Sequence, residues 1–186
     1  ARVIVTEVDP VKAIEAVMDG FSVLPMAQAA PQGDFFITVT GCCGVVDARH
    51  FSLLKDGAIL ANAGHFDVEV DVRALAEASV QRFAARNNIE GFVLPGGKTV
   101  YVLAEGRLVN LAAGDGHPVE IMDMSFAIQA LSARYLAASG RGLPARVTAV
   151  PREIDLAVAR LKLETLGLSI DALTDAQRAY LSGAGG

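Results

Sequence analysis

Residues 58–71 read AILANAGHFDVEVD, and this segment determines which fold we expect. The apolar run 58–61 follows the charged turn 55–57 and ends at Asn62, a pattern typical of a strand buried on both faces of a parallel sheet. Parallel sheets bind ligands beyond the carboxyl ends of their strands. The loop after Asn62 contains Gly64, which would let a ligand approach the backbone, and His65, whose imidazole could give and take protons. We therefore look for chemistry in this loop, although a histidine after a strand is also a common structural residue.

Strand and helix patterns alternate on both sides of this segment. We expect strands at residues 2–7, 22–24, 35–39 and 58–62, and helices at residues 10–18, 26–30, 47–54 and 72–78. The first helix has Asp9 as its N-cap and Pro10 at its first helical position. Repeated strand and helix units with short links predict an α/β fold with a doubly wound parallel sheet.

The pattern changes after residue 89. Two strand-like segments flank Pro95-Gly96-Gly97-Lys98, which predicts a hairpin. Beyond them, helical patterns cover residues 119–138, 152–166 and 175–181. Pro118 at the start of the first of these helices would place His117 beside a helix N-terminus.

Composition excludes several classes of function. The chain has 186 residues, 52% of them apolar, and a net charge of −5 with scattered Lys and Arg, which argues against a nucleic-acid surface or a polybasic membrane anchor. Charges interrupt every apolar stretch before the roughly 20 residues that a membrane span needs, and the first residues predict a strand rather than a signal peptide. We expect a cytoplasmic protein with no nucleic-acid or membrane partner.

The two cysteines support the same compartment. Cys42 and Cys43 are adjacent and have no other cysteine to pair with, so the chain lacks a disulfide framework. Two neighbouring thiols without a nearby histidine also make a poor metal site. We expect no metal, and we expect both cysteines to be small buried residues near a strand end.

Three glycine motifs resemble phosphate-binding loops but lack their context. Residues 140–145 fit G-x-G-x-x-A, but they follow a helix and contain Pro144. Residues 96–99 resemble the end of a P-loop, but Phe92 occupies the position of its first glycine. Residues 41–44, GCCG, have no fingerprint spacing, although a strand-end glycine beside a cofactor remains plausible.

Glu7 is the one acidic residue at a position with a known role. A dinucleotide-binding domain places a carboxylate for the ribose hydroxyls at the end of its second strand, about 20 residues after its glycine fingerprint. No fingerprint precedes Glu7 in this sequence. Glu7 is therefore either a solvated strand end, or the chain begins one strand and one helix too late.

Six short segments of the sequence resemble motifs of a known family. VTEVDP, TGC, GHFDVEVD, LAEGRLVNL, GHP and MDMSF occur in order and at the spacing found in adenosylhomocysteinase (S-adenosylhomocysteine hydrolase), and the sequence resembles the carboxyl-terminal portion of that family over essentially its whole length. In the family, a glycine-rich strand and helix lie directly upstream of Glu7. The resemblance therefore implies a Rossmann-like sheet lacking its first strand and helix. Residues 1–117 would form most of the NAD-binding domain, and residues 118–186 would return to pack on the substrate domain.

The resemblance also implies an activity. A tightly held NAD would be reduced and reoxidised within one turnover while the enzyme, part of one-carbon metabolism, reversibly cleaves S-adenosylhomocysteine to adenosine and homocysteine. Oxidation of the 3′-hydroxyl acidifies the neighbouring carbon, homocysteine is eliminated, water adds and the ketone is reduced. The upstream half of the enzyme would be a necessary partner, since it holds the acidic and lysine residues that act on the ribose.

Site residues follow from the matching motifs. The resemblance implies that the cofactor-binding residues are Glu7, Thr40, Gly41, Ala63, Gly64, His65, Asn110 and His117. Glu7 would hold the adenosine ribose, and Asn110 would hold the nicotinamide carboxamide. His65 would be the catalytic acid and base, would form a gate over the substrate channel with Phe66, and would share substrate binding with Phe66 and His117.

Departures from the family leave alternatives open. The lysine and tyrosine tail that reaches a neighbouring subunit's cofactor in many members is absent, which puts those contacts in doubt within the expected homotetramer or dimer of dimers. The variant Gly114-Asp115-Gly116 leaves adenosine or inosine preference open.

A stand-alone nucleotide-binding or interaction module is the alternative function. Half of a 2-hydroxyacid dehydrogenase is more distant, since its arginine and acid–histidine pair are not found. We also expect residues 119–166 to expose a broad apolar face when isolated.

Overall fold

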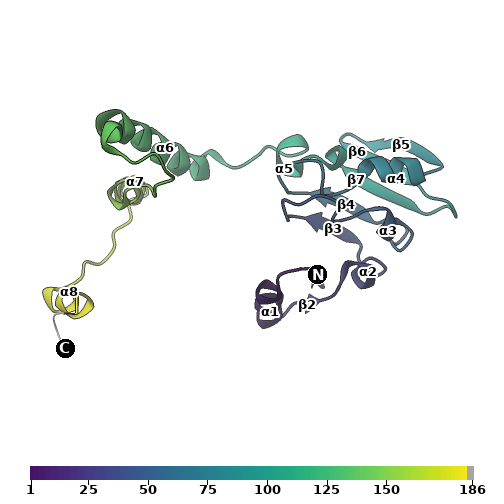
Figure 1. The fold of residues 1–186 in the computed structure, drawn as a ribbon, viewed down its shortest axis with the longest axis horizontal. Helices are drawn as coiled ribbons and strands as arrows, with labels where there is room; N and C mark the ends of the chain where they lie inside the picture. The colour runs from purple at the N-terminus through teal and green to yellow at the C-terminus, as the bar shows by residue number, and fades with distance from the viewer. Residues whose placement is uncertain (184–186) are drawn as a thin grey trace. The chain divides into compact units, whose positions relative to one another are not determined.

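The structure is a computed structural model that describes residues 1–183. The chain forms two compact units, one covering Ala1–Gly116 and one beginning at His117 (Figure 1).

The first unit is built on a five-stranded sheet in the order β3-β4-β7-β6-β5. Its strands are β3 (Phe35–Thr38), β4 (Ile59–Asn62), β5 (Gln81–Arg86), β6 (Ile89–Val93) and β7 (Thr99–Leu103). β3, β4 and β7 run parallel, whereas β6 and β5 continue the sheet in antiparallel pairs. The predicted parallel Rossmann-like core and the hairpin between β6 and β7 are confirmed, and β5 is an addition that the sequence pattern did not predict.

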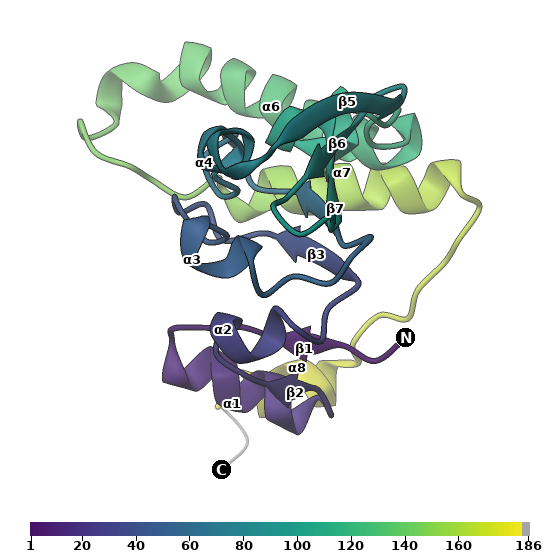
Figure 2. The same cartoon turned by 90° about the vertical axis from the view of Figure 1, so that its right-hand side faces the viewer.

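Three short helices and the sheet enclose the core. α2 (Met26–Ala29), α3 (Ala48–Phe51) and α4 (Val72–Ala78) lie beside β3 and β4, and Figure 2 shows α3 and α4 on one side of the sheet. The fully or nearly buried core side chains include Phe36, Phe51, Leu54, Leu60, Leu75, Phe92, Val100 and Val102. The opposite side of the sheet is more open, with Phe35 71% and Ile37 66% exposed. β4 is therefore buried on one face and only half-buried on the other, which corrects the expectation of burial on both faces.

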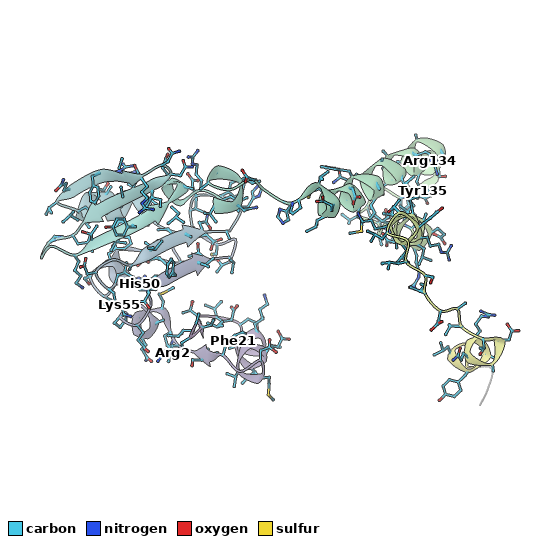
Figure 3. The ribbon with its side chains drawn as sticks, turned by 180° about the vertical axis from the view of Figure 1, so that it is seen from behind. Arg2, Phe21, His50, Lys55, Arg134 and Tyr135 are labelled. Carbon is cyan, nitrogen blue, oxygen red and sulfur yellow. The ribbon has the colours of Figure 1, made fainter. Side chains whose placement is uncertain are left out.

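The amino edge of this sheet is fixed by ion pairs and turns. Lys55 lies at this edge (Figure 3), where its Nζ is 2.7 Å from Asp34 Oδ1. Lys98 Nζ donates to the Leu54 carbonyl at 3.0 Å. The loops that follow the parallel strands, including the loop with His65, lie at the opposite edge, where the strands have their carboxyl ends.

A separate two-stranded parallel sheet precedes the main sheet in the chain. β1 (Ile4–Val5) pairs with β2 (Ser22–Val23), and both are shorter than the predicted strands. α1 (Pro10–Met18) connects them with the predicted bounds, and Asp9 caps it by accepting a hydrogen bond from the Val11 amide at 2.8 Å. Within the described residues, the second edge of β1 and the outer edge of β3 pair with no strand.

Two short helical turns end the first unit. η1 (Ala104–Gly106) follows β7 directly, and α5 (Val109–Ala112) comes next.

The second unit is helical. It contains α6 (Val119–Ser139), α7 (Arg152–Thr165) and α8 (Asp175–Leu181), close to the predicted bounds. A short helical turn that was not predicted, η2 (Gly140–Gly142), follows α6. Lys162 on α7 joins α6 by donating to Asp123 Oδ2 at 2.8 Å and to the Glu120 carbonyl at 3.1 Å. No helix in residues 1–183 is long and apolar enough to cross a membrane.

Leu60 tests this assignment of the core. It lies fully buried on β4, so Leu60→Ala leaves a cavity and should lower the free energy of unfolding by about 2–5 kcal/mol. Urea denaturation followed by circular dichroism measures this loss. Leu53, which is 38% exposed, supplies the control, and Leu53→Ala should cost clearly less. Equal losses for both variants would contradict the core assignment.

Candidate functional site

Three loops come together at the carboxyl ends of the parallel strands. Residues 39–44 follow β3, residues 63–69 follow β4, and residues 104–108 follow β7. Because these strands are neighbours and run in one direction, their following loops share one edge of the sheet. We call these three loops the site edge. Ligands bind at this kind of edge in open α/β sheets.

A buried carboxylate ties two of the loops together. Glu69 is only 1% exposed, and its Oε2 accepts hydrogen bonds from the Thr40 amide at 2.9 Å and the Thr40 hydroxyl at 2.8 Å. Its Oε1 accepts from the Gly41 amide at 2.7 Å. Burial alone raises the pKa of the Glu69 carboxyl, but the hydrogen bonds from Thr40 and Gly41 outweigh burial and leave the pKa below its ordinary value of 4.5. Glu69 is therefore a buried, ionised acceptor, and the sequence did not single it out.

Gly64 has a steric reason to be glycine. A Cβ at this position would lie 1.7 Å from Glu69 Oε1 and 3.0 Å from Asn62 Oδ1. The space that a side chain would fill is thus occupied by the carboxylate that holds Thr40 and Gly41. The sequence suggested close approach of a ligand as the reason for this glycine, and the structure supplies a reason within the protein.

Asn62 connects the end of β3 with the loops after β4 and β7. It is fully buried at the end of β4, and its Oδ1 accepts from the Gly64 amide at 2.7 Å and from the Thr38 hydroxyl at 3.1 Å. Its Nδ2 donates to the Phe66 carbonyl at 2.7 Å and to the Gly106 carbonyl at 2.9 Å. The whole carboxamide is therefore used inside the protein, and it fixes the backbone on either side of His65.

The loop after β7 adopts an uncommon backbone to reach Asn62. Ala104, Glu105 and Gly106 have φ angles of 51°, 58° and 77°, in the left-handed region that costs energy for residues with a Cβ. This turn presents the Gly106 carbonyl to the Asn62 amide. The buried hydrogen bond compensates for part of the backbone strain.

His65 and Phe66 are exposed on this fixed base. Their rings pack edge to face, with centroids 4.5 Å apart and planes at 88°. Within residues 1–183, the His65 imidazole makes no hydrogen bond or ion pair, so it is available to a ligand. The arrangement presents a titratable ring, supported by an aromatic ring, at the site edge.

Glu7 is presented at the end of β1 by its own backbone. Its Oε1 accepts from the Val8 amide at 2.7 Å and the Asp9 amide at 3.0 Å. The hydrogen bonds from Asp9 and then Val8 lower the pKa of the Glu7 carboxyl, which favours the ionised form. Both bonds use the same oxygen, so Oε2 is available as an acceptor for hydroxyl groups.

Three further predicted site residues, Asn110, Ala63 and His117, lie in different parts of the structure. Asn110 lies half-buried on α5, and its backbone carbonyl accepts from the Gly116 amide at 3.1 Å. Ala63 follows β4 at the site edge, and its amide donates to the Thr38 carbonyl at 2.8 Å. His117 begins the second unit, and its contact with the site stays a prediction.

Cys42 and Cys43 correct one expectation. Both are exposed, free thiols rather than buried residues. They lie between Gly41 and Gly44, which have φ angles of 69° and 63° and turn the backbone away from the core.

This fold and edge define a class of protein. A parallel-cored α/β domain with fixed loops at the carboxyl edge, and with an ionised carboxylate at the end of an early strand, is a nucleotide-binding domain. Residues 1–116 match the family model described as "S-adenosyl-L-homocysteine hydrolase, NAD binding domain", and the chain belongs to that family. NAD is therefore the cofactor of this domain.

Curated relatives extend the match beyond residue 116. The chain is 59% identical over 181 residues to an adenosylhomocysteinase of Thermotoga maritima, covering 97% of this chain and 45% of that protein. It is 57% identical over 182 residues to the adenosylhomocysteinase of Aquifex aeolicus, covering 98% and 44%. It is also 53% identical over 182 residues to an S-inosyl-L-homocysteine hydrolase of Methanopyrus kandleri, covering 97% and 43%. The chain thus spans less than half the length of these relatives.

Asn62→Asp tests the hydrogen bonds that join the end of β3 to the loops after β4 and β7. The substitution keeps the shape but replaces the donor Nδ2 with an oxygen that faces the Phe66 and Gly106 carbonyls. We expect the free energy of unfolding to fall by about 2 kcal/mol or more, because buried acceptors would face each other. Asn87→Asp, at the exposed turn between β5 and β6, is the matched control and should change it by less than about 0.5 kcal/mol. Chemical denaturation at pH 7 compares the two variants.

Acid stability tests the charge state of Glu69. Because the folded pKa is lower than the unfolded value of 4.5, ionised Glu69 stabilises the fold above pH 4.5, and this contribution is lost as the pH falls below 4.5 through the folded pKa. The stability difference between the wild type and Glu69→Gln should therefore be largest near pH 7 and shrink in acid. Denaturation series from pH 7 to pH 3 measure this difference, with Glu77→Gln on the exposed face of α4 as the control. A difference that does not depend on pH would show that Glu69 is not ionised in the fold.

Proposed function

We propose that the protein containing this chain is an NAD-dependent hydrolase that reversibly cleaves S-adenosylhomocysteine to adenosine and homocysteine. The observation that carries this proposal is the junction made by Asn62 and Glu69. It joins the loop containing GHFDVEVD to the loops of the TGC and LAEGRLVNL segments, and so gathers the most specific family motifs at one sheet edge.

Residues of the site edge, together with Glu7, Asn110 and His117 outside it, form the proposed NAD-binding set. Glu7 offers an ionised oxygen, Oε2, for the hydroxyls of the adenosine ribose. Thr40, Gly41, Ala63 and Gly64 form the wall between the ends of β3 and β4. Asn110 would orient the nicotinamide by hydrogen bonds to its carboxamide, and His65 and His117 complete the proposed cofactor-binding set. NAD supplies the reversible hydride acceptor for the 3′-carbon of the substrate when it is bound.

His65 is the proposed catalytic residue. After oxidation at the 3′-carbon, elimination requires a proton at the leaving sulfur, and water addition requires removal of a proton from the attacking oxygen. An exposed imidazole has one nitrogen that can donate a proton and one that can accept it, so it can carry out both steps. The Phe66 ring at 4.5 Å restricts the His65 ring, and we assign Phe66 and His117 to substrate binding with it.

An upstream segment of the same protein would complete the sheet. In the order 3-2-1-4-5-6 of dinucleotide-binding domains, the first strand lies between the second and the fourth. β1 and β2 correspond to the second and third strands, and β3, β4 and β7 correspond to the next three. The first strand of that order would then pair with the unpaired edge of β1 on one side and with the unpaired edge of β3 on the other. The helix after that strand would bring its N-terminus to the pyrophosphate and cover the exposed Phe35 and Ile37.

The second unit is the proposed return to the substrate domain. We assign residues 1–117 to the NAD-binding domain and residues 118–186 to the returning helices. The exposed apolar residues of this unit include Val119, Ile121, Phe126, Leu136, Leu161 and Leu166. Large exposed apolar patches are typical of protein interfaces. We expect it to be buried against the substrate domain or another subunit in a homotetramer or dimer of dimers, in the cytoplasm.

The intact protein tests the activity. Purified protein, denatured after gel filtration, should release stoichiometric NAD, and the native protein should release a free thiol from S-adenosylhomocysteine. Comparing S-adenosylhomocysteine with S-inosylhomocysteine determines the purine preference. Protein that holds NAD but releases no thiol from either substrate would support a nucleotide-binding module instead, and protein without NAD would refute the proposal.

His65→Asn tests the catalytic assignment within the intact enzyme. Asparagine keeps a polar side chain but exchanges no proton near neutral pH, so hydrolysis should slow by about 10²–10⁴. NAD should remain bound, and NADH absorbance on mixing with substrate should survive better than overall hydrolysis.

His50 provides the matched control for this variant. It is buried on α3, where its Nδ1 accepts from the Asp47 amide at 3.2 Å, and it lies outside the site edge. His50→Asn should therefore reduce stability and leave turnover of the folded enzyme nearly unchanged. Near-normal turnover in folded, NAD-loaded His65→Asn enzyme would remove His65 from the catalytic role.

A further inference from the structure

The amides between the ends of β3 and β4 are already used by the protein. We define the rim as residues 40–42 and 63–64. The rim amides donate to Glu69 Oε2 from Thr40, to Glu69 Oε1 from Gly41, to Thr40 Oγ1 from Cys42, to the Thr38 carbonyl from Ala63, and to Asn62 Oδ1 from Gly64. A phosphate cradle needs backbone N–H groups directed at the ligand. The rim amides are therefore not free to form a phosphate cradle.

Glu69 controls the largest share of these amides. It accepts three hydrogen bonds from the backbone and side chain of the loop after β3, at 2.7 to 2.9 Å. The carboxylate reaches that loop by passing through the space beside Gly64. Its own burial, at 1% exposure, leaves it no direct contact with a ligand at the rim.

We propose that Glu69 is a positioning residue for NAD, which holds the Thr40–Gly41 turn against the His65 loop and directs the rim amides away from the cofactor. The cofactor's identity rests on the proposed function. Glu69 acts through the backbone of Thr40 and Gly41, and Gly64 is required because its missing side chain leaves room for the carboxylate. The rim amides are then occupied by the protein, so the phosphates of NAD must be held elsewhere.

Two explanations of Gly64 give different results in a double-mutant cycle. If the glycine makes room for Glu69, then Gly64→Ala harms the protein only while the Glu69 carboxylate is present. If the glycine makes room for the ligand, then Gly64→Ala is equally harmful when Glu69 has been shortened. Substitutions of two residues in direct contact are expected to have non-additive effects on the free energy of NAD binding.

The experiment measures the NAD dissociation constant of the intact protein, stripped of cofactor, for the wild type, Gly64→Ala, Glu69→Ala and the double variant. Each single variant should weaken NAD binding by about 10- to 100-fold, the effect of losing charge-assisted hydrogen bonds. The double variant should bind about as weakly as Glu69→Ala alone, because the methyl group that Gly64→Ala adds would occupy the space that the carboxylate left. Glu77→Ala on the exposed face of α4 is the matched control and should bind NAD normally.

Stability separates positioning from a purely structural role. Thermal unfolding of each variant identifies the folded fraction, and a structural role alone would lower the melting temperature while leaving the dissociation constant of folded protein unchanged. Glu69→Gln replaces Glu69→Ala if the latter does not fold, since it keeps the shape and places an amide donor against the Thr40 or Gly41 amide. It should weaken NAD binding over the same range.

The possible outcomes distinguish this proposal from the one on which it rests. Wild-type protein that binds no NAD overturns the proposed function and this role of Glu69 together. Wild-type protein that binds NAD, with additive effects of Gly64→Ala and Glu69→Ala, overturns only the positioning role and assigns Gly64 to ligand contact. Normal NAD binding by folded Glu69→Ala or Glu69→Gln protein also overturns the positioning role alone.

Discussion

The structure of the site depends on burying one charge. Removing the Glu69 carboxylate from water is costly unless hydrogen bonds replace the lost hydration. The replacement donors are the Thr40 amide and hydroxyl and the Gly41 amide, from a loop 28 to 29 residues away in sequence. If either loop moved alone, a buried carboxylate would be left without donors. The ends of β3 and β4 therefore behave as one rigid element.

This rigidity also affects the exposed loop that carries His65, the proposed catalytic residue. Functional side chains are most accurately placed when buried polar residues fix the backbone beneath them. Asn62 holds the carbonyl of Phe66 and the amide of Gly64, on either side of His65, without contacting the His65 ring. The strained turn at residues 104–106 extends the same support to the loop after β7. His65 thus combines an exposed ring with a backbone held on both sides, as its proposed role in acid–base catalysis requires.

The sequence predicted the features that depend on neighbouring residues, such as helix starts and turns. Asp9-Pro10 predicted the start of α1, and Pro95-Gly96-Gly97-Lys98 predicted the turn between β6 and β7. β5, with the polar sequence QRFAAR, was missed because its pairing with β6 rather than its own pattern makes it a strand. Glu69 was missed because an acidic loop residue is normally solvated, and its partners are distant in sequence. The prediction that both cysteines are buried was wrong. It relied on the usual burial of cysteine, whereas Cys42 and Cys43 lie in an exposed turn between Gly41 and Gly44.

The sheet itself supplies the strongest argument that the site edge works within a larger protein. An unpaired strand edge exposes N–H and C=O groups, and natural proteins normally pair or cover such edges. β1 and β3 each leave one edge unpaired within the described residues, and β3 also exposes Phe35 and Ile37 on one face. A single parallel strand between them, followed by a helix on that face, would satisfy both edges and cover both side chains. Because the amides of the rim are already engaged by the protein, the same helix N-terminus is also where the phosphates of NAD would find donors. In the proposed function, one upstream segment would therefore supply both the strand pairing and the phosphate donors.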